Sequence, residues 1–192
     1  MTGERRAGWV TPFIAGRGVS AIGSQVTFLC LPAAVVLVPG ATAATVAVLE
    51  GMTVVGFVLV ALPAGVLADR LPPRALLLVC DLGRAAALVL AAVALTIAAH
   101  RPLAGLVVAA AAIAVSSILT TQNDASAQRL IVGAADRKSR TVLNSWMQGL
   151  ASAAALAGPA LAGVLIAAGG PARGLMIDGE SYLIAALTLE WC

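Results

Sequence analysis

Residues 102–123 read PLAGLVVAAAAIAVSSILTTQN and lie between Arg101 and Asp124, with no charged side chain in between. At about 1.5 Å per residue, a helix over this stretch is about 33 Å long. That length matches the hydrocarbon core of a bilayer, which is about 30 Å thick. The stretch therefore predicts a helix that crosses a membrane.

The composition of the whole chain supports the same class of protein. Of the 192 residues, 60% are hydrophobic and 11% are charged, whereas a soluble domain carries about 25% charged residues. The outer surface must therefore face a lipid bilayer. The net charge of +3 does not predict a nucleic-acid partner, because the basic residues lie between apolar stretches and form no stripe with aromatic side chains.

Repeated apolar stretches, separated by short turns rich in Pro, Gly or charge, predict an all-α membrane protein with a single bundle over 1–192. Pro39-Gly40 and Gly169-Gly170-Pro171 are the strongest breakers, and the polar stretch 124–140 is expected to be a loop. The predicted spans are 12–38, 42–68, 75–99, 103–123, 141–168 and 172–191.

The basic residues are distributed unequally when these loops are alternated across the membrane. One side receives Arg5, Arg6, Arg70, Arg74, Arg129, Arg137, Lys138 and Arg140. The other side receives only Arg101 and Arg173. Because basic loops stay in the cytoplasm, we expect a multi-pass protein of the cell membrane with both termini cytoplasmic.

The turn between the second and third predicted spans, residues 65–74, reads GVLADRLPPR. Gly65 allows close approach of another helix, and Asp69 can accept bonds from free N–H groups at a helix start. Pro72 and Pro73 suit a first helical turn. The plainer interpretation is a solvated turn that anchors the membrane boundary.

The same turn resembles the signature of the major facilitator superfamily, G-x-x-x-D-R-x-G-R-R/K, at the same place in the chain. Pro72 and Pro73 stand where the family has a glycine and a basic residue. The resemblance implies a role in conformational switching for the matching residues, Gly65, Asp69, Arg70 and Arg74.

A second resemblance lies in the fifth predicted span, which is similar to the antiporter motif of drug exporters in that superfamily, G-x-x-x-G-P-x-x-G-G. The corresponding residues are Ala154, Gly158, Pro159, Ala162 and Gly163. The alternative interpretation is a small-residue helix contact. The resemblance implies efflux.

The order of features from about Gly16 to Leu187 resembles the amino-terminal half of the macrolide-efflux and siderophore-exporter-like branch, although Glu180 departs from it. A full-length member has twelve helices, so the resemblance implies that this chain supplies half. The implied partner is a second six-helix half or a second copy. We expect the chain alone not to carry out alternating access, and its end at Cys192 favours a truncation.

Charged residues inside the predicted spans are candidates for function, because they are costly in lipid. Asp81 and Arg84 are three residues apart and can neutralise each other on one helix face. Arg17 can face a cavity, pair with an acid or reach the inner boundary. Asp124 lies near that boundary and is expected to be solvated.

Three carboxylates, Glu50, Asp178 and Glu180, fall in the outer half of the predicted spans. A carboxylate in such a place can exchange the proton that a proton-coupled step requires. Glu50 can also lie among the headgroups if its helix begins late. Asp178 and Glu180 differ by two positions and cannot share a helix face, so only one of them is expected to face a cavity.

Signals of enzymes, metals and cofactors are lacking in the sequence: it contains no H-E-x-x-H pair, no G-x-S-x-G nucleophile and no Gly-rich phosphate loop. Cys30, Cys80 and Cys192 are far apart and are expected to be core residues. The sequence therefore predicts proton-coupled export of a small amphipathic molecule, such as a drug or siderophore. The alternatives are a non-transporting membrane subunit or inactive truncated remnant and, more distantly, an intramembrane enzyme.

Overall fold

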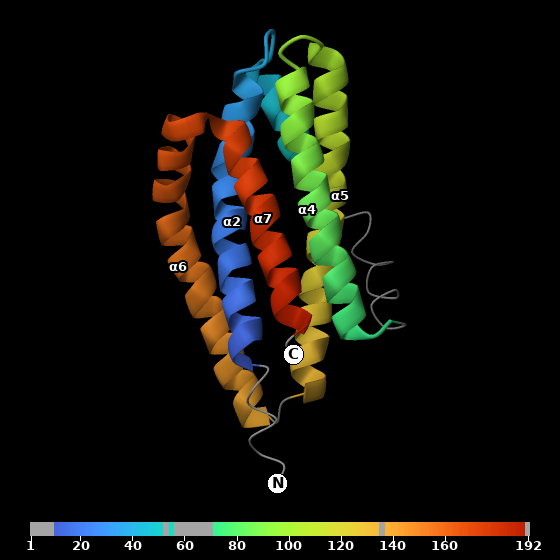
Figure 1. Cartoon of the computed structure of the whole chain (residues 1–192), viewed down its shortest axis with the longest axis vertical. Coiled ribbons are helices and arrows are strands. Elements are labelled where there is room, and N and C mark those ends of the chain that lie inside the picture. The colour runs from blue at the N-terminus through green and yellow to red at the C-terminus, as the bar shows by residue number, and fades with distance from the viewer. Residues whose placement is uncertain (1–9, 52–53, 56–70, 135–136, 191–192) are drawn as a thin grey trace.

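A computed structural model describes residues 10–51, 54–55, 71–134 and 137–190. These residues form a bundle of long helices lying side by side (Figure 1), and no strand is present in this part of the chain. The helices are α2 (Val10–Val36), α4 (Pro73–Ile97), α5 (Pro102–Ala134), α6 (Arg137–Gly169) and α7 (Pro171–Glu190), with a shorter helical segment at 43–51.

The start of the first described helix and the end of the last one lie at the same end of the bundle. In Figure 1, α2 begins and α7 ends at the lower end of the molecule. We call this the terminal end and the opposite one the far end. Within the described residues, α2, α4, α5 and α6 are long and apolar enough to cross a membrane. The 20-residue α7, which carries three carboxylates, is not among these four. Most of the predicted span 42–68 lies outside the described residues.

The predicted loop at 124–140 is wrong, because α5 continues to Ala134 and α6 already begins at Arg137. Hydropathy shows only where an apolar stretch ends. A helix can continue beyond that point, because polar residues with good helix propensity also form its backbone hydrogen bonds. The other described helix ends lie within four residues of the prediction. The two predicted glycine turns are confirmed by positive φ angles of 79° at Gly40 and 80° at Gly170, a conformation that glycine adopts without strain.

The start of α4 also follows the prediction: Pro72 is the N-cap residue and Pro73 the first helical residue. Arg74 is exposed in this first turn. The other three residues of the signature-like turn, Gly65, Asp69 and Arg70, lie outside the described residues.

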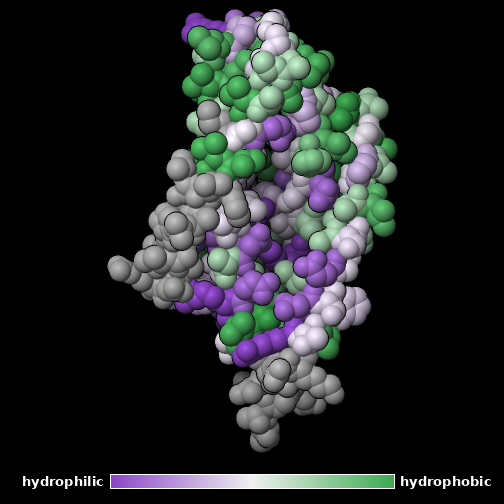
Figure 2. Space-filling model, turned by 180° about the vertical axis from the view of Figure 1, so that it is seen from behind, coloured by the Kyte–Doolittle hydropathy of each residue, from purple (hydrophilic) through white to green (hydrophobic). Residues whose placement is uncertain are grey.

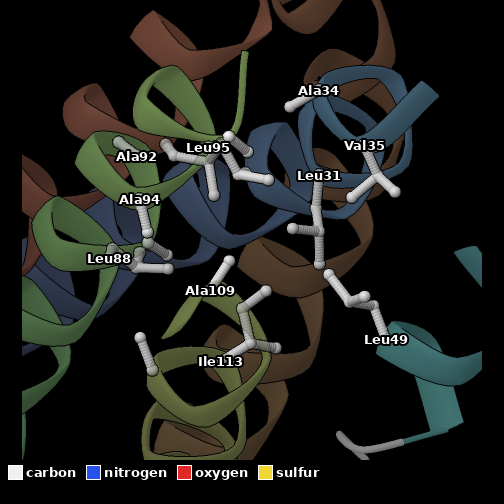
Figure 3. Packing of buried hydrophobic residues seen from close by; sticks show 14 of the residues in the cluster. Leu31, Ala34, Val35, Leu49, Leu88, Ala92, Ala94, Leu95, Ala109 and Ile113 are labelled. Atoms are coloured by element: carbon white, nitrogen blue, oxygen red, sulfur yellow. The ribbon is translucent and has the colours of Figure 1, made fainter. Parts of the chain in front are cut away.

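The two largest of four apolar clusters in the core of the described residues lie at different heights of the bundle. The far-end cluster joins α2, α4 and α5 through residues such as Leu31, Leu88 and Ile113 (Figure 3). The terminal-end cluster contains Phe13 of α2 and Leu189 of α7. On α2, α4 and α5 the buried polar residues lie between these clusters, and on α7 Asp178 and Ser181 lie between Leu175 and Tyr182 of the far-end cluster. The polar chemistry of the described residues is therefore concentrated near mid-height.

Candidate functional site

A cavity of about 350 Å³ lies at mid-height among α2, α4, α5, α7 and the segment at 43–51. Its far-end wall is apolar and shares Leu31, Leu88 and Ile113 with the far-end cluster. The remaining lining residues are Ser24, Thr27, Phe28, Glu50, Arg84, Ser116, Ser117, Thr120, Asp178 and Tyr182. Hydroxyl groups and charges therefore face one apolar wall, which suits a ligand with both polar and apolar parts.

Asp178 is the most deeply buried carboxylate in this lining, with 1% of its surface exposed. Thr27 Oγ1 donates a hydrogen bond of 2.6 Å to its Oδ2, and Ser181 Oγ lies 3.0 Å from its Oδ1. Among the described residues, no basic side chain lies within ion-pair distance of Asp178. Two hydroxyl groups thus take the place of a counter-ion.

Arg84 of α4 provides a buried positive charge across from Asp178. Its Nη2 donates a 2.6 Å hydrogen bond to Tyr182 Oη, and its guanidinium carbon lies 3.7 Å from the centroid of the Tyr182 ring. Tyr182 Oη is 2.8 Å from Ser24 Oγ, and Ser24 donates to the Ser20 carbonyl. Because Ser24 uses its hydrogen there, Tyr182 is the donor to Ser24, and α4, α7 and α2 are tied together.

A second set of polar contacts continues from Arg84 toward the terminal end. Arg84 Nη1 lies 3.6 Å from Asp81 Oδ1, which also accepts a 2.8 Å hydrogen bond from Asn123 Nδ2. Asn123 Oδ1 in turn accepts a hydrogen bond from Arg17, whose Nη2 forms a 2.6 Å ion pair with Asp124. We call these five residues together with Tyr182 and Ser24 the polar chain, because their contacts run from an exposed carboxylate to the cavity without a break.

The structure resolves several alternatives that the sequence left open. Arg17 pairs with Asp124, whose side chain is 59% exposed, and Asp81 lies beside Arg84 as the spacing predicted. Glu50 and Asp178 both line the cavity. Glu180 is exposed on another face of α7, so of Asp178 and Glu180 only Asp178 is in the cavity lining.

Sequence reasoning missed Asn123 and Tyr182, which join the charged residues. Asn123 is fully buried and Tyr182 is 3% exposed. An asparagine next to the predicted boundary and a lone tyrosine give no periodic signal. Their place beside the predicted charges on other helices becomes visible only when those helices are packed.

The antiporter-like residues divide between two faces of α6. Ala154, Gly158 and Ala162 recur every four residues and are buried, whereas Pro159 and Gly163 are exposed. A Cβ atom added at Gly158 would collide with Gln25 of α2, but one at Gly163 would meet nothing within 4 Å. Half of this motif therefore brings α6 against α2, and the other half remains open to a partner or to lipid.

Metal chemistry has no apparent centre in this part of the molecule: the described residues contain no group of three or more His, Cys, Asp or Glu side chains that could hold a metal ion. What the arrangement offers is a polar cavity with hydroxyl donors, one embedded cation and two carboxylates. It lies inside a helical bundle with an apolar exterior, and Figure 2 shows hydrophilic residues around a hollow in the face opposite that of Figure 1.

These features define a multi-pass membrane protein with a polar cavity between its spanning helices. A family model described as Major Facilitator Superfamily matches residues 13–191. The chain therefore belongs to the major facilitator superfamily, whose members are transporters. Comparison with curated proteins gives no match.

Proposed function

We propose that the chain serves a secondary active transporter that exports a small amphipathic molecule in exchange for protons. The observation that carries the proposal is Asp178, a carboxylate buried beside a cavity of about 350 Å³, which accepts hydrogen bonds from hydroxyl groups and has no described basic side chain within ion-pair distance. The apolar wall formed by Leu31, Leu88 and Ile113 fits the apolar part of such a substrate. The facing hydroxyl groups fit its polar part.

The carboxylate supplies the means of coupling. A charge held away from water is costly, and a carboxyl group removes that charge when it takes up a proton. Protonation of Asp178 would change the net charge of the cavity by one and so alter its affinity for a charged or polar substrate. Glu50 lines the same cavity and is the second candidate for this role.

Alternating access requires two bodies that move against each other around a central site. We assign the second body to a second six-helix half or to a second copy of the chain, covering the face with the hydrophilic hollow. In this proposal Gly65, Asp69, Arg70 and Arg74 control the switching, and the exposed Pro159 side of α6 contributes to the contact that closes the cavity.

The experiment compares Asp178→Asn with Glu180→Gln, since both remove one carboxylate from α7 but only Asp178 lines the cavity. The chain is produced with and without a second six-helix half in a bacterial strain that lacks its own pumps, and export of ethidium is followed at several external pH values. We expect Asp178→Asn to lose export or its pH dependence at unchanged membrane abundance. Glu180→Gln should behave like the parent chain.

Two results would contradict the proposal. If Asp178→Asn exports ethidium with the parent's pH dependence, Asp178 does not couple protons, and Glu50→Gln becomes the next test. If the parent chain, with or without the second half, exports neither ethidium nor any neutral or anionic amphipathic dye, the export assignment itself fails.

A further inference from the structure

Glu180 occupies an unusual place for a charged residue in a membrane protein. It is exposed on α7, nine residues after Pro171 and ten residues before Glu190. At about 1.5 Å per residue, either end of the helix is about 14 Å away, which is farther than a glutamate side chain reaches. Glu180 therefore lies near the middle of a hydrocarbon layer about 30 Å thick, where an unsatisfied carboxylate is costly.

The chain itself offers this carboxylate no partner among the described residues, since no hydrogen bond or ion pair joins any of them to Glu180. Its neighbours on the same helix face are Met176, Leu183 and Ile184, which are 44%, 43% and 48% exposed. Arg173 lies seven residues earlier on that face, but its guanidinium is beside the backbone of Gly169, in the turn before α7. It points away from Glu180.

A protein that covers the cavity side would not cover this residue. Asp178 and Tyr182 are the α7 residues that line the cavity, and Glu180, two positions from each, lies on another face of the helix. The need to satisfy Glu180 is therefore separate from the need to close the cavity. It calls for a contact on that other face of α7.

The exposed stripe of α7 has the geometry of a helix-pairing surface. Its residues follow one another at intervals of three, four, three and four: Arg173, Met176, Glu180, Leu183 and Leu187. This is the spacing of helices that cross at a small angle and interlock their side chains. A single polar residue within such a stripe fixes which residues meet.

We propose that the α7 stripe is a contact between two copies of this chain, related by a two-fold axis normal to the membrane. Copies insert in the same orientation, so equal positions meet at equal depth, and Glu180 would face Glu180 of the second copy. A protonated carboxyl group has one O–H donor and an acceptor oxygen. Two such groups satisfy each other, which two lysines or two arginines cannot do. The inference does not depend on transport.

Cysteine cross-linking tests this contact directly. In a chain with Cys30, Cys80 and Cys192 replaced by alanine, Leu183→Cys should form a disulfide-linked dimer in lipid vesicles that contain this chain alone. Leu156→Cys is the matched control, because Leu156 is 83% exposed on α6; we expect it to stay monomeric.

Substitution of Glu180 then shows whether the carboxyl group is responsible. Glu180→Gln should keep the dimer, because an amide both donates and accepts. Glu180→Leu should weaken self-association roughly tenfold, although it suits lipid better and should insert at least as well; recovery from membranes and helical content verify this.

Equal cross-linking at positions 183 and 156, or an unchanged dimer with Glu180→Leu, would overturn the proposal. A parent chain that stays monomeric in these vesicles would also refute it. The occupant to test would then be a helix of another protein with a hydrogen-bond donor at mid-depth.

Discussion

At the scale of single residues, Asp81 and Asp124 belong to one polar chain but lie in different surroundings. The side chain of Asp81 is 5% exposed and lies beside the equally buried Arg84, whereas that of Asp124 is 59% exposed. An ion pair that water reaches contributes about 0–1 kcal/mol. Removal of one partner from a buried pair leaves an uncompensated charge and costs about 3–5 kcal/mol.

These surroundings predict unequal effects of two matched substitutions. Asp81→Asn should lower the free energy of unfolding by about 3 kcal/mol, because Arg84 loses its nearest carboxylate. Asp124→Asn should lower it by at most about 1 kcal/mol. Denaturation in mixed micelles measures both, and equal losses would show that the burial of the Asp81–Arg84 pair does not stabilise the bundle.

Contacts between single side chains were the features that the sequence predicted least well. The i, i+3 spacing of Asp81 and Arg84 identified that pair, since both lie on one helix. Asn123 and Tyr182 were missed because they meet the pair from α5 and α7, and contacts between distant segments leave no mark in local spacing. Which of Asp178 and Glu180 faces the cavity likewise depended on how α7 is rotated.

At the scale of helices, small residues determine how closely α6 approaches α2. Gly158 is the point of contact, since an added Cβ atom there would collide with Gln25. Gly163, on the same helix, has free space around it. The substitution of glycine by alanine favours either helix by up to about 1 kcal/mol through propensity, so the difference between the two sites isolates the packing.

We therefore expect opposite results from alanine at these two positions. Gly158→Ala should lower the free energy of unfolding by about 1–3 kcal/mol through overpacking. Gly163→Ala should leave it unchanged or raise it slightly. The same denaturation assay measures the free energy of unfolding of both variants. If the Gly158→Ala chain is as stable as its parent, close packing of α6 against α2 at Gly158 does not stabilise the bundle.

Helix positions were largely predictable because a run of apolar residues between Pro, Gly and charged residues defines a span. The end of α5 was not, since Asp124, Gln128 and Arg129 interrupt the apolar run, yet the helix continues to Ala134. The sequence thus located the end of the apolar stretch and not the end of the helix. The small-residue motif in α6 was visible, but its division into a packed and an exposed side required the neighbouring α2.

At the scale of the whole molecule, the arrangement is an apolar exterior around a polar mid-height, with the start of α2 and the end of α7 at one end (Figure 1). The family and the all-helical class were predictable from composition and motif order. The cavity was not, because five separate segments contribute to its lining.

The orientation in the membrane gives a prediction at this scale. Ser139 is exposed near the start of α6, in the region where basic residues accumulate. A Ser139→Cys variant without the native cysteines should react with an impermeant thiol reagent only from the cytoplasmic side. Labelling from outside alone would reverse the assignment of both termini.

The cavity is expected to be an aqueous site inside a membrane-spanning bundle. Ser117 lines it, whereas Val115, two residues earlier on α5, is not among its lining residues and is 48% exposed. In membranes, and without the native cysteines, Ser117→Cys should react with a small charged methanethiosulfonate reagent, and Val115→Cys should remain unlabelled in lipid. Labelling of position 115 but not 117, or equal reactivity at both, would contradict the account.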